Sequence, residues 1–470
     1  MTDSIQLVGR LRRIVGDRYL LGSDNSDAGP FLTEQRGDYE SHPLCVVLPA
    51  DTGEVSQVIT ACADANVTVV PQGGNTGLCG GAVAENGEVI LSLKRLRAIR
   101  HRDQLNGTIT VEAGCVLADI QAVAHDMNRM FPVSLGAEGS CLIGGIISTN
   151  AGGINVLRYG NTRSQVLGLE VVLADGRVWD GLTALLKNNT GYDLKQLFIG
   201  AEGTLGIVTA ATLRLYPQAV QSQTILLGFS NLDDALQLLI LARQLSGDQL
   251  SSFELIPDIA MQAAANHVPG CDNPLETSHP WYILCQFATS SHVININAIT
   301  EAFLARSLDE GWLNDAVISG SESQEKSLWK IREAIVAGQR AEGKTVSHDV
   351  SVPVSKVPEL ISRVMVEVQR VLPGTRPYPF GHIGDGNIHC NLLQPVGMDP
   401  DDFVAAKPAL RQAVYGIVTS LNGSFSAEHG IGLLKLDLMR QHKNRVELDM
   451  MRTLKKAIDP DGLMNSGKII

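Results

Sequence analysis

The sequence predicts an α+β fold with more than one domain. Its 470 residues correspond to two or three domains of roughly 150 residues each. Over residues 43–217, short β-branched runs alternate with amphipathic segments, which is typical of mixed helices and strands. The helical periods become longer after Pro217, so a second domain is expected there.

Residues 1–40 are predicted to form an N-terminal lead-in. Its first apolar residues recur at helical spacing, and a polar stretch rich in Gly, Asp and Ser follows them. These apolar residues are Ile5, Leu7, Val8, Leu11 and Ile14. We therefore expect a short helix before the first domain.

The first domain is predicted over residues 41–217. A helical pattern covers residues 54–65, and Asp175-Gly176 is a strong signal for a β-hairpin between its flanking runs. Strands are predicted at 67–70, 89–93, 167–174 and 177–179. This domain should therefore contain both helices and antiparallel strands.

The second domain is predicted over residues 218–425, and a C-terminal segment over 426–470 is expected to return to the first domain. A strand is predicted at 281–287. Helical periodicity predicts helices at 233–245, 297–308, 327–342, 408–421 and 445–458.

The composition argues against several classes of protein. The 38 Lys and Arg against 50 Asp and Glu give a net charge of −12, which disfavours a nucleic-acid partner. Neither a secretory signal nor an apolar run of 18 residues occurs, so no transmembrane segment is expected. The eight cysteines form no C-x-x-C pair, which argues against iron–sulfur and zinc-ribbon sites and favours reduced core thiols in a cytoplasmic protein.

Glycine is concentrated in three loops. The first, residues 71–81, follows a predicted strand, and its successive amides can form a nest for a pyrophosphate. Taken alone, this loop is equally consistent with a mobile surface loop. Similar runs recur at 136–153 and 200–206, and three such loops indicate an extended ligand such as a dinucleotide.

Other catalytic and nucleotide-binding motifs do not occur in the sequence. No Gly-x-Gly-x-x-Gly follows a strand, so a Rossmann domain is not expected. No Gly-x-Ser-x-Gly elbow and no His-Glu-x-x-His pair occur either, so an α/β-hydrolase or a zincin protease has no local support.

Several long motifs resemble a known flavoprotein superfamily. The runs 71–81, 144–153 and 197–206 resemble the vanillyl-alcohol-oxidase-type FAD-binding superfamily. The runs 380–389 and 426–430 resemble its D-2-hydroxyacid dehydrogenase branch, which includes D-2-hydroxyglutarate dehydrogenases and FAD-linked D-lactate dehydrogenases. The resemblance implies a non-Rossmann, two-subdomain FAD-binding domain of the PCMH type, an α/β cap domain for the substrate and an FAD-linked oxidase C-terminal region.

The resemblance also implies how FAD is held. Some members attach the flavin covalently through a His in the first loop, but this chain has Asn75 in that neighbourhood, so non-covalent FAD is expected. The expected cofactor-binding residues are Pro71, Gly73, Gly74, Asn75, Thr76, Gly77, Gly139, Ser140, Gly144, Gly145, Thr149, Asn150, Gly153, Glu202, Ile207 and Asn465.

A histidine pair lies in the second domain. Asp385-Gly386 is a two-residue hairpin signal, which predicts His382 and His389 as cross-strand partners with Cβ atoms about 4.5–5.5 Å apart. Such a pair can share one metal ion, and two ordinary hydrogen-bonded histidines are the alternative. Asn391 would project from the same face as His389 and could reach a substrate oxygen.

Glu428 would complete a metal site. Two His and one Glu with an open position are typical of catalytic zinc, and manganese or cobalt could use the same ligands. The resemblance agrees, because His382, His389 and Glu428 match the metal ligands of hydroxyglutarate-type members. His429 matches their general base.

The resemblance further implies a substrate site. Arg332 matches the residue that binds the substrate carboxylate, where bidentate pairing favours Arg over Lys. Hydroxyglutarate-type members usually carry a small hydroxyl residue at the position of Val336 and a Lys at that of Ser347. A second carboxylate would be costly to bury without them, so a D-lactate-like monocarboxylate is expected at least as strongly as D-2-hydroxyglutarate.

The leading hypothesis is an FAD-linked, metal-assisted D-2-hydroxyacid dehydrogenase. His429 takes the hydroxyl proton, a hydride passes from Cα to flavin N5, and the electrons continue to a quinone or an electron-transfer flavoprotein. Three alternatives stay open, namely a flavoprotein oxidase that uses oxygen, a non-catalytic flavin-binding protein and a metal-dependent hydrolase. The substrate side chain, the metal, and a monomeric or homodimeric state also stay open.

Overall fold

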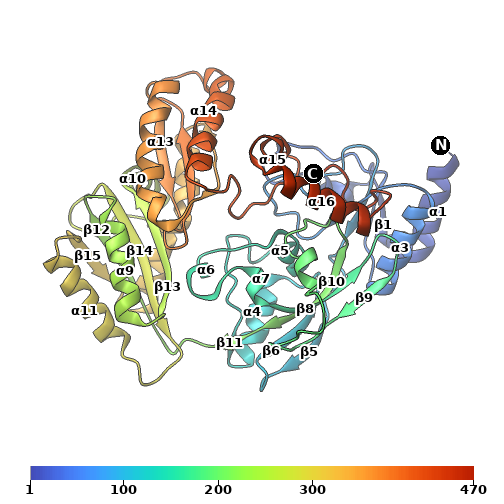
Figure 1. The fold of residues 1–470 in the computed structure, drawn as a ribbon, viewed down its shortest axis with the longest axis horizontal. Helices are drawn as coiled ribbons and strands as arrows, with labels where there is room; N and C mark the ends of the chain where they lie inside the picture. Colours follow the sequence, from blue (N-terminus) through green and yellow to red (C-terminus); the bar gives the residue numbers. More distant parts are fainter. Residues whose placement is uncertain (1) are drawn as a thin grey trace. The chain divides into compact units, whose positions relative to one another are not determined.

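A computed structural model describes residues 2–470, with side chains described from Ser4 onward. The chain divides into two compact units (Figure 1). Unit 1 contains Met1–Gly152, Asn161–Pro217 and Glu428–Ile470, and unit 2 contains Gly153–Gly160 and Gln218–Ala427. Both units mix helices and strands, which confirms the predicted α+β class.

The observed division differs from the predicted one in three places. The stretch predicted as a lead-in, 1–40, belongs to unit 1, and residues 153–160 belong to unit 2. The chain re-enters unit 1 at Glu428, two residues after the predicted start at 426.

The first sheet of unit 1 has the strand order β1-β2-β4-β3. Its strands are β1 (Leu20–Gly22), β2 (Cys45–Val47), β3 (Val69–Gln72) and β4 (Val89–Ser92). β2 and β3 pair in parallel with β4, and the parallel pairs require a crossover, which α3 (Thr52–Asp64) supplies between β2 and β3. The Asp51 side chain caps α3 by accepting a hydrogen bond from the Glu54 amide at 2.9 Å.

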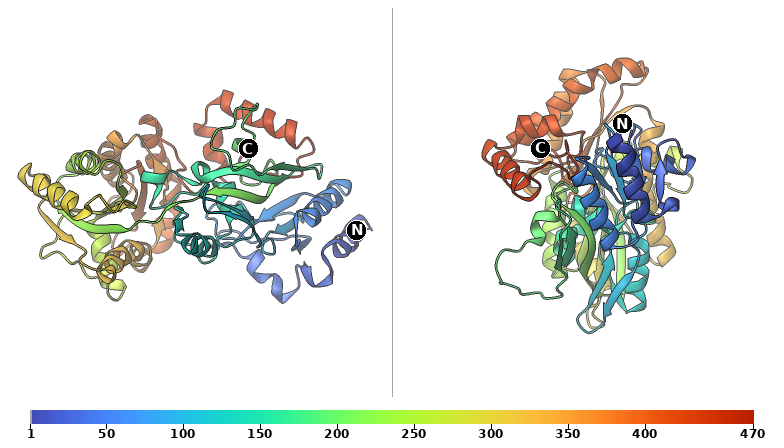
Figure 2. Two further views of the ribbon diagram at one scale, coloured as in Figure 1. Left: turned by 90° about the horizontal axis from the view of Figure 1, so that it is seen from below. Right: turned by 90° about the vertical axis from the view of Figure 1, so that its right-hand side faces the viewer.

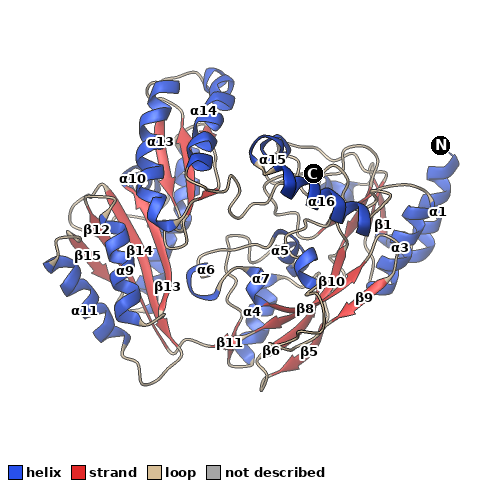
Figure 3. Ribbon diagram, viewed as in Figure 1, coloured by secondary structure: helices blue, strands red, loops and turns tan. Residues whose placement is uncertain are grey.

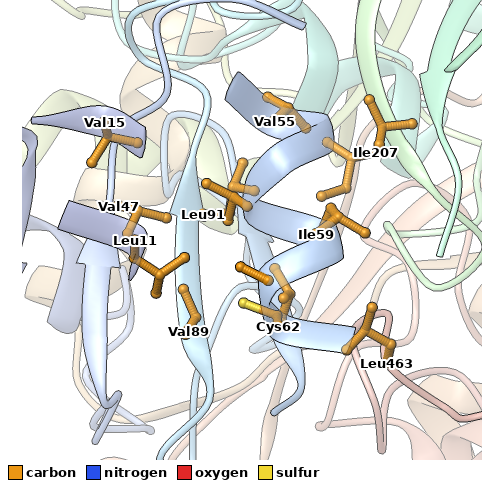
Figure 4. Close-up of a cluster of buried hydrophobic side chains, with 14 of the residues drawn as sticks. Leu11, Val15, Val47, Val55, Ile59, Cys62, Val89, Leu91, Ile207 and Leu463 are labelled. Carbon is orange, nitrogen blue, oxygen red and sulfur yellow. The ribbon is translucent and has the colours of Figure 1, made fainter. Parts of the chain in front are cut away.

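Two helices pack their apolar faces onto this sheet. Leu11 and Val15 of α1 (Thr2–Val15) share a buried cluster with Val55 and Ile59 of α3 (Figure 4). Burial of each such side chain stabilises the fold by about 1.5–3 kcal/mol. The predicted lead-in helix is therefore part of the core of unit 1.

The second sheet of unit 1 is antiparallel, with the order β5-β6-β10-β8-β9. Its strands are β5 (Ile99–Asp103), β6 (Thr108–Glu112), β8 (Val166–Val172), β9 (Val178–Gly181) and β10 (Ile207–Arg214). The Leu173 amide donates to the Arg177 carbonyl at 2.9 Å, and Gly176 has a φ of 80°. The hairpin predicted from Asp175-Gly176 is therefore confirmed.

Shorter elements complete unit 1. They are β7 (Arg129–Met130), β11 (Tyr216–Pro217), α2 (Gly29–Leu32), α4 (Leu117–Asp126), α5 (Ile143–Thr149), α7 (Thr162–Gln165), α8 (Lys195–Phe198), α15 (Leu436–His442) and α16 (Arg445–Ile458), with single 3-10 turns at 17–19 and 26–28. The C-terminal segment, red in Figure 2, rejoins the first sheet where Met464 forms a parallel bridge to Val69.

The larger sheet of unit 2 has the order β13-β14-β12-β15. Its strands are β12 (Gln221–Phe229), β13 (Leu250–Pro257), β14 (Trp281–Thr289) and β15 (Asp315–Ile318). Figure 3 shows α9 (Asp234–Ser246) and α11 (Ile296–Asp309) over one face. The ring of Phe287 in β14 lies 5.6 Å from that of Phe303 in α11, centroid to centroid. The other face, which includes Leu284, packs against α10 (Asp258–His267) and α12 (Glu322–Ala341).

A smaller sheet in unit 2 is built around β19. Both β16 and β17 pair with β19, and β18 pairs with it as well. The elements of this part are β16 (Thr345–Val346), β17 (Val350–Ser351), β18 (Arg376–Phe380), β19 (Asn387–Leu393), α13 (Val357–Val371), α14 (Pro400–Ser420) and a 3-10 turn at 354–356. The separate short helix α6 (Val156–Tyr159) also belongs to unit 2.

Two helices begin earlier than predicted. α12 starts at Glu322 because Ser321 caps it, and α14 starts at Pro400 because Asp399 accepts a hydrogen bond from the Asp401 amide. Pro408, the predicted start of α14, lies inside that helix.

Two compositional expectations can be compared with the structure. No helix within residues 2–470 is both long enough and apolar enough to cross a membrane. All eight cysteines are buried free thiols, as predicted from their spacing.

Candidate active site

The hairpin of β18 and β19 has a different register from the predicted one. Phe380 is the partner of His389, so the predicted pairing of His382 with His389 is wrong. The strands are joined by the longer loop 381–386. Gly381 causes the change, because with a φ of 126° it leaves β18 and exchanges two backbone hydrogen bonds with Leu255 of β13.

The loop 381–386 lies along the outer edge of β13 and places His382 beside Glu254. The Gly384 amide donates to the Phe253 carbonyl at 3.3 Å, next to the bridge at Gly381. His382 Nδ1 then lies 2.6 Å from Glu254 Oε1. The two histidine rings still come close, with centroids 5.7 Å apart, so the pair is assembled through β13.

Glu254 also pairs with Arg332 of α12. Arg332 Nε donates to Glu254 Oε2 at 2.8 Å, so each carboxylate oxygen has its own partner. Burial alone would raise the pKa of Glu254, which is 1% exposed, but His382 and Arg332 outweigh it and lower the pKa to about 2. The carboxylate is therefore ionised between two groups that can carry positive charge.

Arg332 keeps hydrogen-bond donors for a ligand. Its Cζ lies 5.1 Å from the Phe380 ring centroid, and the His389 ring lies 5.0 Å from the same ring. Arg332 Nη1 and Nη2 have no hydrogen-bond partner among the described residues, so they can pair with a carboxylate. Phe380 therefore lies beside both the predicted carboxylate-binding residue and a predicted metal ligand.

Two side chains of unit 2 could share a metal ion. Asp349 and His389 each offer one ligand atom, and these atoms lie within 4.8 Å of each other. Glu428 and His429 directly follow Ala427, whose amide donates to the Asp349 carbonyl at 3.2 Å. Imidazole and carboxylate donors of this kind suit zinc, manganese or cobalt.

This pair differs from the ligands predicted within unit 2. It contains His389, but its second member is Asp349 and not His382. Asp349 is buried, and its Oδ1 accepts a hydrogen bond from Asn387 Nδ2 at 3.1 Å. Asp349 is therefore held in place by β19.

The remaining predicted substrate residues lie on α12, on β19 and beside β16. Val336, which is 41% exposed, is one helical turn after Arg332 and on the same face, and Ser347 is also exposed. Asn391 is buried, with Oδ1 accepting from the His348 amide and Nδ2 donating to Gln339, both at 3.0 Å. A further contact of Asn391 would use its second Nδ2 hydrogen or the second lone pair of Oδ1.

The first two glycine loops pack against each other in unit 1. A Cβ on Gly74 would lie 2.2 Å from Ser140 O, and one on Gly73 would lie 3.4 Å from Gly145 Cα. Gly74 is therefore required for a close approach of two backbones. The space in the direction of its absent Cβ is filled by that backbone.

Other positions of these loops are open to a ligand. In the part of the chain that the structure describes, the amides of 74–77 donate to no intramolecular acceptor, and Asn75 has a φ of 57°. An added Cβ on Gly77 or Gly139 would meet nothing within 4 Å. Successive free amides beside open glycines fit an anionic pyrophosphate.

The Asn75 side chain is used within unit 1. Its Nδ2 donates to the carbonyls of Pro30 and Thr33 at 3.2 and 2.8 Å. Asn75 has no imidazole that could attach a flavin covalently, and its carboxamide is already used to hold residues 30 and 33.

The predicted cofactor residue Glu202 connects the third loop to other segments of unit 1. Its amide donates to the Ser148 carbonyl at 2.8 Å, and its carboxylate accepts from the amides of Ile431 and Gly432 at 2.7 and 2.8 Å. Burial raises the pKa of Glu202, although these two amides act in the opposite direction.

Asn465 offers a further polar atom to a ligand. Its Nδ2 donates to the carbonyls of Gly81 and Glu202, and its Oδ1 is buried with no partner within residues 2–470. Ile207 belongs to the buried core of unit 1. The remaining predicted cofactor residues are Pro71 in β3, Thr76 in the first loop, Gly144 and Thr149 in α5, Asn150 at the C-terminal cap of α5, and Gly153 in unit 2.

Sequence reasoning missed Glu254 and Asp349. A sequence signal existed for Glu254, because it is the charged residue in the otherwise uncharged strand Leu250–Pro257, and a buried charge needs a partner. Asp349 directly follows the buried His348 and precedes β17, but its spacing alone does not indicate a metal group.

Two family models match the chain. The FAD binding domain matches residues 43–181, and the C-terminal domain of FAD linked oxidases matches residues 219–469. The first model contains the motif runs 71–81 and 144–153, and the second contains the runs 380–389 and 426–430.

Named relatives and a solved structure agree with these models. The chain is 39% identical over 429 residues to the D-2-hydroxyglutarate dehydrogenase of Xanthomonas citri pv. viticola, covering 91% of this chain and 89% of the relative. It is 38% identical over 464 residues to the probable mitochondrial D-2-hydroxyglutarate dehydrogenase of Oryza sativa subsp. indica, covering 98% and 81%. Substrate-bound p-cresol methylhydroxylase shares the fold, with a TM-score of 0.77 at 16% identity over 100% of this chain and 97% of that one. The chain therefore belongs to the family of FAD linked oxidases that includes the D-2-hydroxyglutarate dehydrogenases.

Proposed function

We propose that the chain catalyses the FAD-dependent oxidation of a D-2-hydroxy acid to the 2-oxo acid and passes the electrons to a quinone or an electron-transfer flavoprotein. Family membership supports this class of reaction. The observation that carries the proposal is the position of Arg332 and His389, which both lie beside Phe380. A carboxylate bound to Arg332 would bring its adjacent hydroxyl group toward an imidazole that can ligate a metal.

Arg332 would bind the substrate carboxylate. Its Nη1 and Nη2 atoms would form the bidentate pair while Nε stays on Glu254. Phe380 would support the guanidinium plane from one side. Such binding fixes the carbon that bears the hydroxyl group, which is what a positioned reaction requires.

His429 would accept the hydroxyl proton. An alcohol proton is hard to remove at neutral pH, so a base benefits from a cation beside the hydroxyl oxygen. Zinc, or manganese or cobalt, held by His382, His389 and Glu428 would supply that cation. The ligand atoms of His389 and Asp349 lie within 4.8 Å of each other in unit 2, which supports a cation beside His389.

FAD would be held without a covalent bond in unit 1. When bound, FAD supplies the electron sink that accepts the hydride at N5. The free amides of 74–77 would bind its pyrophosphate, and the orphaned Oδ1 of Asn465 would accept a hydrogen bond from an N–H or O–H group of FAD. The engaged carboxamide of Asn75 supports the absence of a covalent bond.

A monocarboxylate with a small or apolar side chain would be at least as good a substrate as D-2-hydroxyglutarate. Val336 shares the α12 face of Arg332, and the exposed Ser347 is uncharged, so neither position offers a cation to a second carboxylate. The relatives compared above carry the name D-2-hydroxyglutarate dehydrogenase, so D-lactate and D-2-hydroxyglutarate are the two acids to compare.

The proposed location of the protein is the cytoplasm. Its eight free thiols favour this location.

An Arg332→Lys variant tests the proposed function, with Arg340→Lys as the matched control. Lys cannot keep both the Glu254 contact and a bidentate substrate contact, so KM for a D-2-hydroxy acid should rise by about 10- to 100-fold, as expected for lost charge-assisted hydrogen bonds. Arg340 is exposed on the same helix, and its variant should keep the wild-type KM. Equal KM values in all three proteins, or no oxidation of any D-2-hydroxy acid by the wild type, would contradict the proposal.

A further inference from the structure

Glu254 connects two residues to which the proposed function gives different tasks. Its Oε1 lies 2.6 Å from His382 Nδ1, and its Oε2 accepts from Arg332 Nε at 2.8 Å. Glu254 is 1% exposed, so water cannot replace either partner. One carboxylate therefore holds the predicted metal ligand and the predicted carboxylate-binding residue together.

Three separate elements of unit 2 fix this arrangement. On β13, Glu254 is the register partner of Leu284, which faces α10 and α12, so Glu254 also points to the side from which Arg332 comes. The bridge between Gly381 and Leu255 sets the neighbouring His382 opposite Glu254. The contacts thus follow from strand alternation and loop register.

The chemistry of the two contacts gives each a consequence. A histidine that binds a metal through Nε2 must carry its ring proton on Nδ1, and a carboxylate acceptor at Nδ1 selects that tautomer. A hydrogen bond at Arg332 Nε fixes the rotation of the guanidinium and so the direction of Nη1 and Nη2.

We propose that Glu254 is a positioning residue that sets the tautomer of His382 for a divalent metal ion and the orientation of Arg332 for the substrate carboxylate. This inference rests on the proposed function, which assigns those tasks to His382 and Arg332. It adds a residue that couples metal binding to substrate binding.

Glu254→Gln separates the two contacts. A Gln side chain has one acceptor oxygen and one donor nitrogen, and Arg332 can only donate, so the Gln oxygen must face Arg332. The Gln NH₂ group then faces His382 Nδ1, which must accept and move its proton to Nε2. The variant should therefore lose metal affinity while Arg332 keeps its acceptor.

The test measures zinc affinity of the FAD-loaded enzyme by competition with a chromophoric chelator. Glu254→Gln should raise the zinc dissociation constant by about 10- to 100-fold, the usual effect of losing such an outer partner of a metal-bound histidine. Glu254→Asp keeps two acceptor oxygens and should stay within a few-fold of the wild type. Glu325→Gln is the matched control, because Glu325 accepts from Gln286 and Ser222 in the same unit, and its zinc affinity should not change.

A second measurement needs no variant at position 254. The ¹⁵N shifts of the His382 ring in the zinc-free, FAD-loaded wild type, assigned with His382→Asn, should show the proton on Nδ1. A proton on Nε2 would overturn the inference even if Glu254→Gln failed to fold.

The outcomes distinguish this inference from the proposed function. Wild-type zinc affinity in Glu254→Gln would refute the role of Glu254 alone, because the metal site would still exist. Failure of the wild type to bind zinc, manganese or cobalt would refute the proposed metal site and this inference with it. Normal zinc affinity in Glu325→Gln with a loss in Glu254→Gln supports both.

Discussion

Replacing Gly74 by Ala should destabilise unit 1 even without its cofactor. The added Cβ would lie 2.2 Å from Ser140 O and 3.0 Å from Cys141 Cα, and both are backbone atoms that cannot rotate away. The first and second glycine loops would have to separate. Overpacking of this kind costs about 1–3 kcal/mol of the free energy of unfolding.

Gly77→Ala is the matched control for this prediction. A Cβ on Gly77 would meet no atom within 4 Å, and Gly77 is not among the residues with positive φ. Ala at such a position reduces the freedom of the unfolded chain, so the cofactor-free protein should keep its stability or gain up to about 1 kcal/mol. The same methyl group would occupy the space that we assign to FAD, so FAD affinity should fall.

Urea unfolding of the flavin-free proteins, followed by circular dichroism, gives the comparison. We expect a lower unfolding midpoint for Gly74→Ala than for the wild type, and no decrease for Gly77→Ala. FAD titration, followed by quenching of flavin fluorescence, should show weaker binding in both variants. A wild-type midpoint in Gly74→Ala would refute the assignment of this glycine to loop packing.

Further predictions concern the metal, the flavin, the substrate and the folded state. Exhaustive chelation should abolish turnover and added zinc should restore it, whereas full activity after chelation would remove the metal from the mechanism. Acid precipitation should release the yellow colour into the supernatant, and colour left on the protein would show covalent flavin despite Asn75. Ser347→Lys should raise activity on D-2-hydroxyglutarate relative to D-lactate, and an unchanged ratio would contradict the specificity argument. Burial alone would raise the pKa of Glu170, but Arg100 and two threonine hydroxyls lower it. The ionised Glu170 therefore stabilises the fold fully above its ordinary pKa of about 4.3. This stabilisation is lost as the pH falls through the lower pKa that Glu170 has in the folded protein. The stability difference between wild type and Glu170→Gln should therefore shrink below pH ~4, and a constant difference down to pH ~3 would contradict it.

Local signals in the sequence were sufficient for many elements. The helix predicted over 445–458 has the bounds of α16, and the Asp175-Gly176 hairpin forms as expected. These features depend on periodicity and turn chemistry within a few residues. The motif runs also identified the family correctly, because glycine loops that approach a cofactor tolerate few other residues.

The geometry of the candidate site could not be predicted in the same way. The prediction that His382 and His389 are cross-strand partners assumes a two-residue turn at Asp385-Gly386. Gly381 instead pairs with Leu255, which lies 126 positions earlier in the chain (381 − 255 = 126). Glu254 becomes the partner of His382 only through that long-range contact. Similarly, the sequence does not distinguish the packing glycine Gly74 from the open Gly77, because both occur in one loop.

The most direct test of the central claim is anaerobic reduction of the bound flavin by a D-2-hydroxy acid. The metal-loaded enzyme would be mixed with D-lactate, D-2-hydroxyglutarate or an L enantiomer, and flavin absorbance and the 2-oxo acid would be measured together. We predict one 2-oxo acid formed for each flavin reduced, with no reduction by the L acids. A flavin that stays oxidised with every D-2-hydroxy acid would contradict the account.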